Sequence, residues 1–377
     1  RSHTCLPICD EGNDMDHEEH EDEDVTKEIE QRIASKDLSV RADALRDMIR
    51  LLSMEEKPMS AIRPYIDVAI ELNEQLERPS ELAHIYWMFS DICFYTKDFD
   101  ASLEALYKSI EHARASFNFS TLPSTTGNVA NLMMKRDDYL GAIDWYKQSF
   151  DYAMEQGKFL FAARTQMFMV TCYMALQDYE EAHNCANEAY QLFVTYDSQF
   201  GMVDALHQMA WAQLFGCFEG SPTVPEIIAK TGALLELITH PFGDEMHTFI
   251  KAMYEIDFGF YNPTTLEAIE GGMEVTRGRN DAAATATFNF LRAKYMAKVG
   301  RHMEAIGILR NLLLVTDEIG ARIHRSDLNE LLLDTEIATG RLELAANTAL
   351  RAANEAAQAS DPDAEKYYRA KAGELFL

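Results

Sequence analysis

Three five-residue stretches recur at a fixed spacing: DFDAS at residues 98–102, DYLGA at 138–142 and DYEEA at 178–182. Each begins with Asp and an aromatic residue and ends with a small residue, and consecutive copies start forty residues apart. Two further copies, RHMEA at 301–305 and RLELA at 341–345, share that spacing and that small last residue. A fixed period of this size is the sequence signature of a repeat protein.

Stretches with apolar residues at helical spacing precede and follow each of these turn motifs. Ile85, Met88 and Ile92 lead into the first motif, and Leu106 and Ile110 follow it, with the three- and four-residue steps of one helix face. Glycines and prolines fall between the stretches, where turns are needed. The pattern predicts an all-α protein, a solenoid of about eight helix-turn-helix repeats.

The unit resembles the tetratricopeptide repeat, because small residues stand where its two helices would touch. These residues are Ser90, Ala130 and Ala293 in the first helix, and Ser102, Ala142, Ala182, Ala305, Ala345, Ser109, Ser149, Ala189 and Ala352 in the second. A bulky side chain at such a contact would force the helices apart, at about 1–3 kcal/mol. The resemblance covers residues 41–377 and implies a right-handed superhelix whose first helices line a concave, ligand-binding face.

The forty-residue period exceeds the 34 residues of the commonest tetratricopeptide form. Repeats of this length are similar to sensory regions of bacterial signalling proteins, including regions before diguanylate cyclase (GGDEF) domains, and to peptide-sensing regulators. The resemblance implies a sensory or regulatory module that binds a protein or peptide. A static assembly scaffold is one alternative. The N-terminal part of a diguanylate cyclase is another, since we expect the natural chain to continue beyond Leu377.

The chain is strongly acidic, with a formal net charge of −28. Residues 1–30 hold twelve acidic and two basic residues and supply −10 of that charge. A polyanion repels phosphate groups, which argues against nucleic acids and anionic membrane surfaces as partners. No apolar run reaches the length of a membrane-spanning helix, so we expect no membrane insertion.

The chain divides into an acidic N-terminal segment and a repeat domain. We expect residues 1–34 to form a disordered tail, because so dense a block of like charges favours solvation. Cys5, Cys9, His17 and His20 lie in this segment, but their spacing fits no zinc motif, and no metal site is predicted. Residues 35–377 form the repeat domain, in which the segment 201–262 carries the pattern weakly.

No catalytic motif is present. The sequence lacks a glycine-rich phosphate loop, a nucleophile elbow and a cysteine–histidine pair in the context of a thiol nucleophile. We therefore predict that the chain is not an enzyme and needs no cofactor. Cysteines in apolar helical stretches read as buried free thiols, which favours a reducing, cytoplasmic compartment, with the periplasm as the alternative.

The resemblance assigns ligand binding to side chains of the first helices. Carried over position by position, it implies His84, Trp87, Asp91, Tyr95, Ser124, Asn131, Lys135, Arg164, Met167, Thr171, Thr287, Phe290, Lys294 and Lys298. Within this set, Asn131, Lys135 and Arg164 could clamp a carboxylate or an extended peptide backbone. The alternative is that these three are ordinary solvated residues. Trp87 and Tyr95 could anchor a ligand, although aromatic residues at this spacing are more often core.

Overall fold

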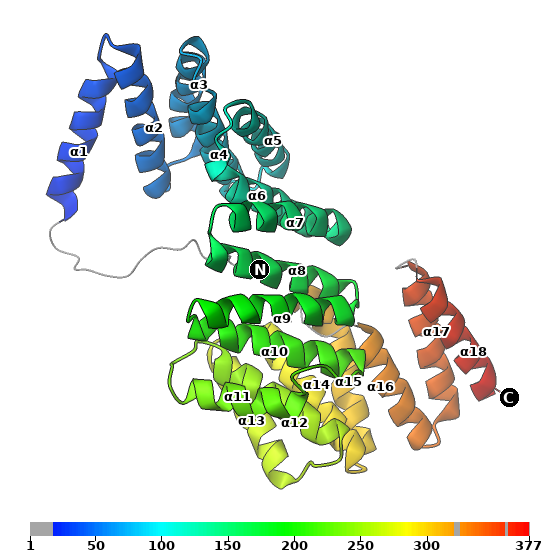
Figure 1. Ribbon diagram of the computed structural model, residues 1–377. Coiled ribbons are helices and arrows are strands. Elements are labelled where there is room, and N and C mark those ends of the chain that lie inside the picture. The colour runs from blue at the N-terminus through cyan, green and yellow to red at the C-terminus, as the bar shows by residue number, and fades with distance from the viewer. Residues whose placement is uncertain (1–17, 320–324, 359–360, 377) are drawn as a thin grey trace. The chain divides into compact units, whose positions relative to one another are not determined.

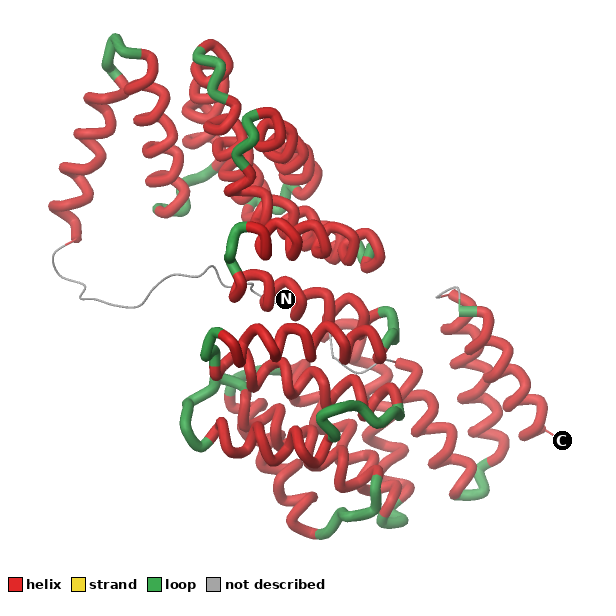
Figure 2. Tube along the Cα trace, viewed as in Figure 1, coloured by secondary structure: helices red, strands yellow, loops and turns green. Residues whose placement is uncertain are grey.

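A computed structural model describes residues 18–319, 325–358 and 361–376, with only the backbone given for 18–24 and 316–319. These residues form eighteen α-helices and one short 3-10 helix, joined by loops and without a strand in the part described (Figures 1 and 2). The chain divides into two compact units between Ala212 and Gln213, so the division falls within helix α10.

The N-terminal unit is a series of antiparallel helical hairpins. Its helices are α1 (Glu18–Ile33), α2 (Leu38–Met54), α3 (Met59–Gln75), α4 (Pro79–Tyr95), α5 (Phe99–Ala115), η1 (Phe119–Thr121), α6 (Leu122–Lys135), α7 (Tyr139–Glu155), α8 (Phe159–Ala175), α9 (Tyr179–Thr195) and α10 (Gln199–Gly216). Even-numbered helices from α2 onward are first helices, and α2, α4, α6 and α8 each pack on the second helix that follows.

The C-terminal unit continues the same alternation. Its helices are α11 (Val224–Leu235), α12 (Gly243–Asp257), α13 (Pro263–Gly278), α14 (Ala282–Lys298), α15 (His302–Ile319), α16 (Arg325–Ala338), α17 (Leu342–Gln358) and α18 (Pro362–Phe376). Helices α2 to α17 make eight first-helix and second-helix pairs, which confirms the predicted number of repeats. The weakly patterned segment 201–262 is helical as well and supplies most of α10, α11 and α12.

The three turn motifs that begin with Asp start their second helices by the same local chemistry. The side chains of Asp98, Asp138 and Asp178 accept hydrogen bonds from the backbone N–H three residues later. Such an N-cap satisfies a donor that the helix leaves unpaired. The residue before each Asp has a positive φ, which ends the preceding helix in the left-handed conformation. The motif is therefore a helix stop followed at once by a helix start.

The small residues are buried at the helix contacts, as predicted. Three of them are serines whose hydroxyls bond to the preceding helix: Ser102 to the carbonyl of Ser90 at 2.9 Å, Ser109 to that of Ala83 at 2.7 Å, and Ser149 to that of Pro123 at 2.6 Å. A buried hydroxyl needs such a partner. Serine thus serves at these contacts as well as alanine does.

Helix α1 lies inside the segment that we expected to be a disordered tail, and for residues 18–33 that expectation was wrong. Ile29 is buried, and Ile33 packs with it against Ala44 and Met48 of α2. This apolar face stabilises the helix despite its acidic residues. Residues 1–17, with Cys5, Cys9 and His17, lie outside the described residues; His20 lies in the helix.

No helix in the described ranges is long and apolar enough to cross a membrane.

Candidate ligand-binding face

Four predicted ligand residues follow one face of α4. His84, Trp87, Asp91 and Tyr95 are spaced by three, four and four residues, which places them in a row along the helix. We call this row the α4 face. The side chains of His84, Trp87 and Asp91 are half-buried. That of Tyr95, near the C-terminal end of the helix, is 68% exposed.

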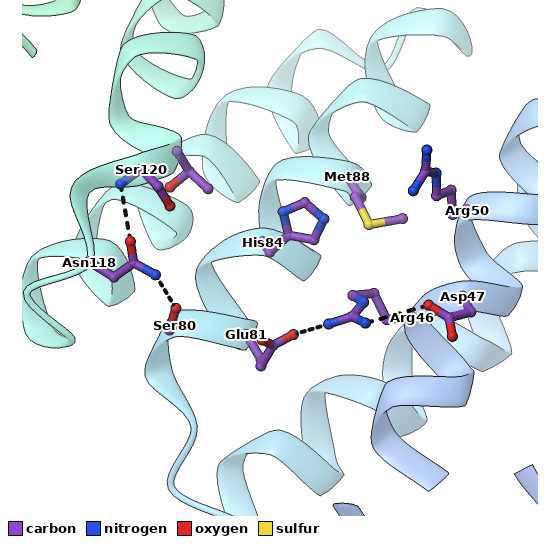
Figure 3. Close-up of a pocket in the computed structure, with 10 residues that line it drawn as sticks. Arg46, Asp47, Arg50, Ser80, Glu81, His84, Met88, Asn118 and Ser120 are labelled. Carbon is purple, nitrogen blue, oxygen red and sulfur yellow. Dashed lines mark hydrogen bonds and ion pairs between the residues drawn. The ribbon is translucent and has the colours of Figure 1, made fainter. Parts of the chain in front are cut away.

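A pocket of about 350 Å³ opens at the His84 end of the α4 face (Figure 3). It lies between α2, α4 and the segment that leads into α6, all within the N-terminal unit. We call it the α2–α4 pocket. Its lining residues are Arg46, Asp47, Arg50, Ser80, Glu81, His84, Met88, Asn118, Ser120 and Thr121. Asn118 holds the far wall, since its amide donates to the Ser80 hydroxyl at 2.6 Å and its side-chain oxygen accepts from the Ser120 backbone at 3.2 Å.

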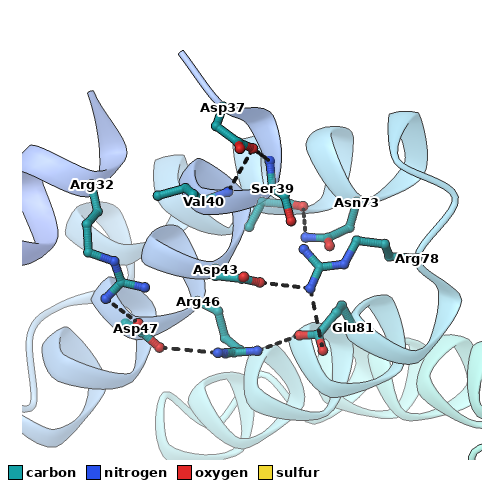
Figure 4. A network of polar contacts seen from close by, with 11 residues as sticks. Arg32, Asp37, Ser39, Val40, Asp43, Arg46, Asp47, Asn73, Arg78 and Glu81 are labelled. Carbon is teal, nitrogen blue, oxygen red and sulfur yellow. Dashed lines mark hydrogen bonds and ion pairs between the residues drawn. The ribbon is translucent and has the colours of Figure 1, made fainter. Parts of the chain in front are cut away.

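Three of the residues that line this pocket, Arg46, Asp47 and Glu81, belong to an ion-pair network (Figure 4). Arg46 bonds to Glu81 of α4 at 2.6 Å and to Asp47 at 3.5 Å, and Asp47 also pairs with Arg32 of α1 at 3.0 Å. Arg78, just before α4, pairs with Asp43 of α2 at 2.8 Å. The network joins α1, α2 and α4, so the charge of Arg46 is already compensated within the protein.

Arg50 differs from Arg46, because its exposed side chain makes no ion pair or hydrogen bond to any residue that the structure describes. It lines the same pocket one turn further along α2. Burial, and the positive charges of Arg46 and Arg50, lower the pKa of His84, against an opposing effect of Glu81. The imidazole is therefore neutral at pH 7, and Arg50 is the cation that this pocket can offer to a ligand.

Asp91 lies two turns beyond His84 on the α4 face. Its carboxylate accepts one hydrogen bond, from the side-chain amide of Asn128 on α6 at 3.0 Å. No ion pair to Asp91 occurs in the described ranges. Burial alone raises its pKa to about 7.

The two aromatic residues of the α4 face have different environments. Trp87 packs against the apolar clusters of two successive repeats, and its ring lies 5.5 Å from that of His84. Its indole N–H is nevertheless buried without an acceptor among the described residues. Tyr95 is largely exposed, and its ring makes an edge contact with that of Phe94.

The structure does not join the three residues of the predicted clamp to one another. The Asn131 side-chain oxygen accepts the hydroxyl of Tyr146 at 2.5 Å, while Arg164 bonds within its own helix to the Leu160 carbonyl at 3.4 Å. Lys135 is exposed, and no hydrogen bond joins it to Asn131 or Arg164. A clamp of these three residues stays a prediction. On α8, Met167 packs against an apolar cluster and Thr171 is exposed.

The predicted ligand residues on α14, in the C-terminal unit, differ in their burial and contacts. Phe290 and Thr287 are 3% and 6% exposed, so their assignment to a ligand-facing row was wrong: they are core. Lys294 forms an ion pair with Asp257 at 2.5 Å. Lys298 is exposed at the C-terminal end of the helix. Ser124, in the N-terminal unit, is half-buried on α6.

Sequence reasoning missed Arg46, Arg50, Asn118 and Asn128. A signal for the first two existed, since α2 and α4 begin 41 residues apart, at Leu38 and Pro79. In that register, Arg46 and Arg50 stand where α4 has Trp87 and Asp91. The corresponding turn of this first repeat, at residues 58–62, lacks the Asp and the aromatic residue of the other motifs, so the sequence pattern did not reveal this register.

No family model matches the chain, and no curated protein sequence matches it. Among solved structures it is similar to the apo form of RapI, with a TM-score of 0.50 and 15% identity over 80% of this chain and 99% of that one. It is also similar to PH0952 from Pyrococcus horikoshii, a signal transduction ATPase with a tetratricopeptide repeat sensor, with a TM-score of 0.50 and 11% identity over 93% and 51% of the two chains. At identities this low, the structural similarity shows a shared fold alone. In its fold, the chain is a tetratricopeptide-type helical-repeat protein.

Proposed function

We propose that this chain is a non-enzymatic module that binds a peptide or an extended protein segment on the first-helix face of its N-terminal unit. The observation that carries the proposal is the α2–α4 pocket, which is lined mainly by residues of the first helices α2 and α4 and includes His84 of the α4 face. Ligand sites are typically concave, with a few polar groups placed to fix orientation. Here those groups are Arg50, Ser80 and Asn118.

The row of groups suits an extended chain. His84 and Asp91 are seven residues apart, which is roughly 10 Å along a helix at 1.5 Å per residue. An extended peptide spans that length with about three residues at 3.3 Å each. His84 and Asp91, with Trp87 between them, would thus meet successive side chains of one segment.

We further propose a regulatory role, in the cytoplasm, within a bacterial signal-transduction protein. The tetratricopeptide repeat of PH0952 is described as a sensor, and repeats in a solenoid contact only their neighbours, so a bound segment can alter curvature. A static scaffold is the alternative, and it would hold a large folded partner instead of a short segment. The N-terminal part of a diguanylate cyclase is a further alternative.

The test is capture from a lysate of source cells with the full chain as bait, read by mass spectrometry. The pocket variant carries Arg50→Ala and His84→Ala, and a second variant carries Asn131→Ala, Lys135→Ala and Arg164→Ala. A matched control carries Arg114→Ala and Lys147→Ala, two exposed cations of second helices. Loss of a captured peptide or protein in the pocket variant alone is the expected result.

Other outcomes are equally informative. A partner lost only with the second variant would move the site to α6 and α8. A partner held equally by all variants would contradict the proposed face and favour the scaffold. Capture of a short peptide supports the sensor, whereas a stable complex with a large folded protein favours the scaffold.

A further inference from the structure

Asp91 is a carboxylate without a counter-ion in a partly desolvated place. It is half-buried between α4 and α6, and its one hydrogen-bond partner, the amide of Asn128, is neutral. Desolvating a carboxylate is unfavourable unless a positive charge or several donors compensate for it. Elsewhere in this unit, carboxylates at helix contacts do have such partners, as Glu81 has Arg46 and Asp43 has Arg78. Asp91 is thus an exception to the pattern of its own surroundings.

The residues one turn before and one turn after Asp91 are aromatic. Trp87 precedes it by four residues and Tyr95 follows it by four, so both lie on the same stripe of α4. Aromatic faces attract cations, and more strongly so where water is excluded. The Trp87 indole N–H, buried without an acceptor among the described residues, is a further group on this stripe that a ligand can satisfy.

Among the described residues, no cation compensates for Asp91. Arg46 is held by Glu81 and Asp47, and the free Arg50 and neutral His84 belong to the α2–α4 pocket. Lys135 of α6 is exposed, and no ion pair joins it to Asp91. None of these four groups contributes to the raised pKa of Asp91, which burial alone explains.

A metal ion does not fit this place. A divalent cation is usually bound by several oxygen or nitrogen ligands, and no group of three or more His, Cys, Asp or Glu side chains in the described ranges could hold one. A monovalent organic cation needs one carboxylate and apolar or aromatic walls. Lysine and arginine side chains have that chemistry, with an apolar stem and a charged end.

We propose that Asp91 is the specificity determinant for a lysine or arginine side chain of a peptide that lies along the α4 face, with Trp87 and Tyr95 flanking the bound stem. The inference rests on the proposed peptide-binding function and names the class of ligand that the site selects. A net charge of −28 adds a long-range attraction for basic segments. This attraction speeds their association but does not determine where on the protein they bind.

Such binding has a proton signature. The carboxyl of Asp91 is about half protonated near pH 7 in the free protein. An arriving cation stabilises the charged form, so the proton leaves as the ligand binds. Near neutral pH, binding of a basic peptide therefore releases a fraction of a proton.

The test uses a library of random octapeptides, acetylated and amidated at their ends so that only side chains carry charge. The immobilised full chain, its Asp91→Asn variant and a control Asp144→Asn are screened side by side. Asp144 is an exposed carboxylate on α7, so the control removes the same charge from a second helix. We expect peptides enriched in Lys or Arg at one position with the parent and the control, and loss of that enrichment with Asp91→Asn.

Calorimetry on one captured peptide then separates recognition from general attraction. In two buffers of different ionisation enthalpy at pH 7, the parent should release protons on binding and Asp91→Asn should release none. Replacing the basic residue of the peptide by norleucine should weaken binding to the parent at least about tenfold. The same replacement should have little effect on binding to Asp91→Asn.

Each remaining outcome contradicts a stated part. If peptides bind without a basic preference, or if Asp91→Asn keeps that preference, the assignment of Asp91 is overturned and the proposed peptide binding survives. If no peptide is retained above background by the parent, peptide binding itself is overturned, and the inference with it. A variant that fails to fold is recognised by circular dichroism, and the norleucine comparison on the parent then decides.

Discussion

The carboxylate of Glu336 on α16 is fully buried and accepts a hydrogen bond from the guanidinium of Arg310 on α15 at 2.6 Å. Its other oxygen accepts the hydroxyl of Thr348 on α17 at 2.7 Å. One side chain therefore joins three successive helices of the C-terminal unit. Arg310 itself is 45% exposed, so the pair lies between the core and the solvent.

Removing Arg310 should leave this carboxylate buried without its counter-ion. A fully buried pair broken in this way loses about 3–5 kcal/mol. Because Arg310 is partly exposed and water can reach its place, we expect Arg310→Met to lower the free energy of unfolding by about 2 kcal/mol. Urea unfolding followed by circular dichroism measures the loss.

The double variant Arg310→Met with Glu336→Gln is the control for that measurement. It removes both charges and keeps an amide that can bond to Thr348, so most of the stability should return. If the single variant proves as stable as the parent, the ion pair makes no contribution, and α15, α16 and α17 are held by their apolar contacts alone.

Two neighbouring glycines of α13 should respond oppositely to alanine. A methyl group at Gly271 would meet nothing, whereas one at Gly272 would collide with the ring of Phe288 on α14. Gly271→Ala should raise the free energy of unfolding by up to about 1 kcal/mol, because glycine is a poor helix former. Gly272→Ala should lower it by about 1–3 kcal/mol through overpacking. Thermal or urea unfolding of both variants checks this. Equal effects at the two sites would contradict the close contact between Gly272 of α13 and Phe288 of α14.

The repeat architecture could be predicted because its determinants are local. Asp138 caps its own helix three residues on, and Ser149 reaches the carbonyl of Pro123 in the same repeat. Such contacts recur with the period, so five copies of one motif in the sequence reveal them. Helix α1 was missed because the packing of Ile29 and Ile33 against α2 stabilises it although its sequence is strongly acidic. No local pattern shows that balance.

The candidate site could be predicted only in part. The helical period places His84, Trp87, Asp91 and Tyr95 in one row, whatever the rest of the chain does. Whether each side chain is free depends on its neighbours in other repeats. Phe290 was assigned to the same row in α14 and is core, because it packs against Leu309 and Leu313 of α15. The packing of successive helices determines which residues contact Phe290. The spacing of residues along one helix does not show those contacts.

The charge of Arg50 should contribute to the lowered pKa of His84. Burial is the main cause of the lowered pKa of His84, and the guanidinium of Arg50 adds to it. Arg50→Ala removes one positive charge from the pocket, and the pKa of His84 should rise. A pH titration of the His84 ring protons by NMR measures the change, with the resonance assigned from a His84→Gln spectrum. Arg164→Ala, on α8, should leave the titration unchanged; an equal rise there would show that Arg50 acts only through net charge.

The stability of the protein should depend on pH through Asp91. Its folded-state pKa of about 7 lies above the ordinary value of 3.8, so the folded protein holds a proton that the unfolded chain releases. Between those two values the free energy of unfolding therefore falls as pH rises, and above pH 7 the whole penalty is present. Asp91→Asn removes this penalty and keeps an oxygen for the Asn128 amide. The variant should match the parent below about pH 4 and exceed its stability by about 2–4 kcal/mol above pH 7.

Urea unfolding of parent and variant at pH 4.5, 6 and 8 gives the decisive comparison. Other carboxylates titrate in the same range, but they affect both proteins equally, so the difference between the two isolates Asp91. Asp144→Asn, at an exposed site, should follow the parent at every pH. A difference between Asp91→Asn and the parent that stays constant from pH 4.5 to 8 would mean that Asp91 is ionised throughout. A compensating cation already present in the protein would then have to account for it, and the place for a ligand cation would be lost.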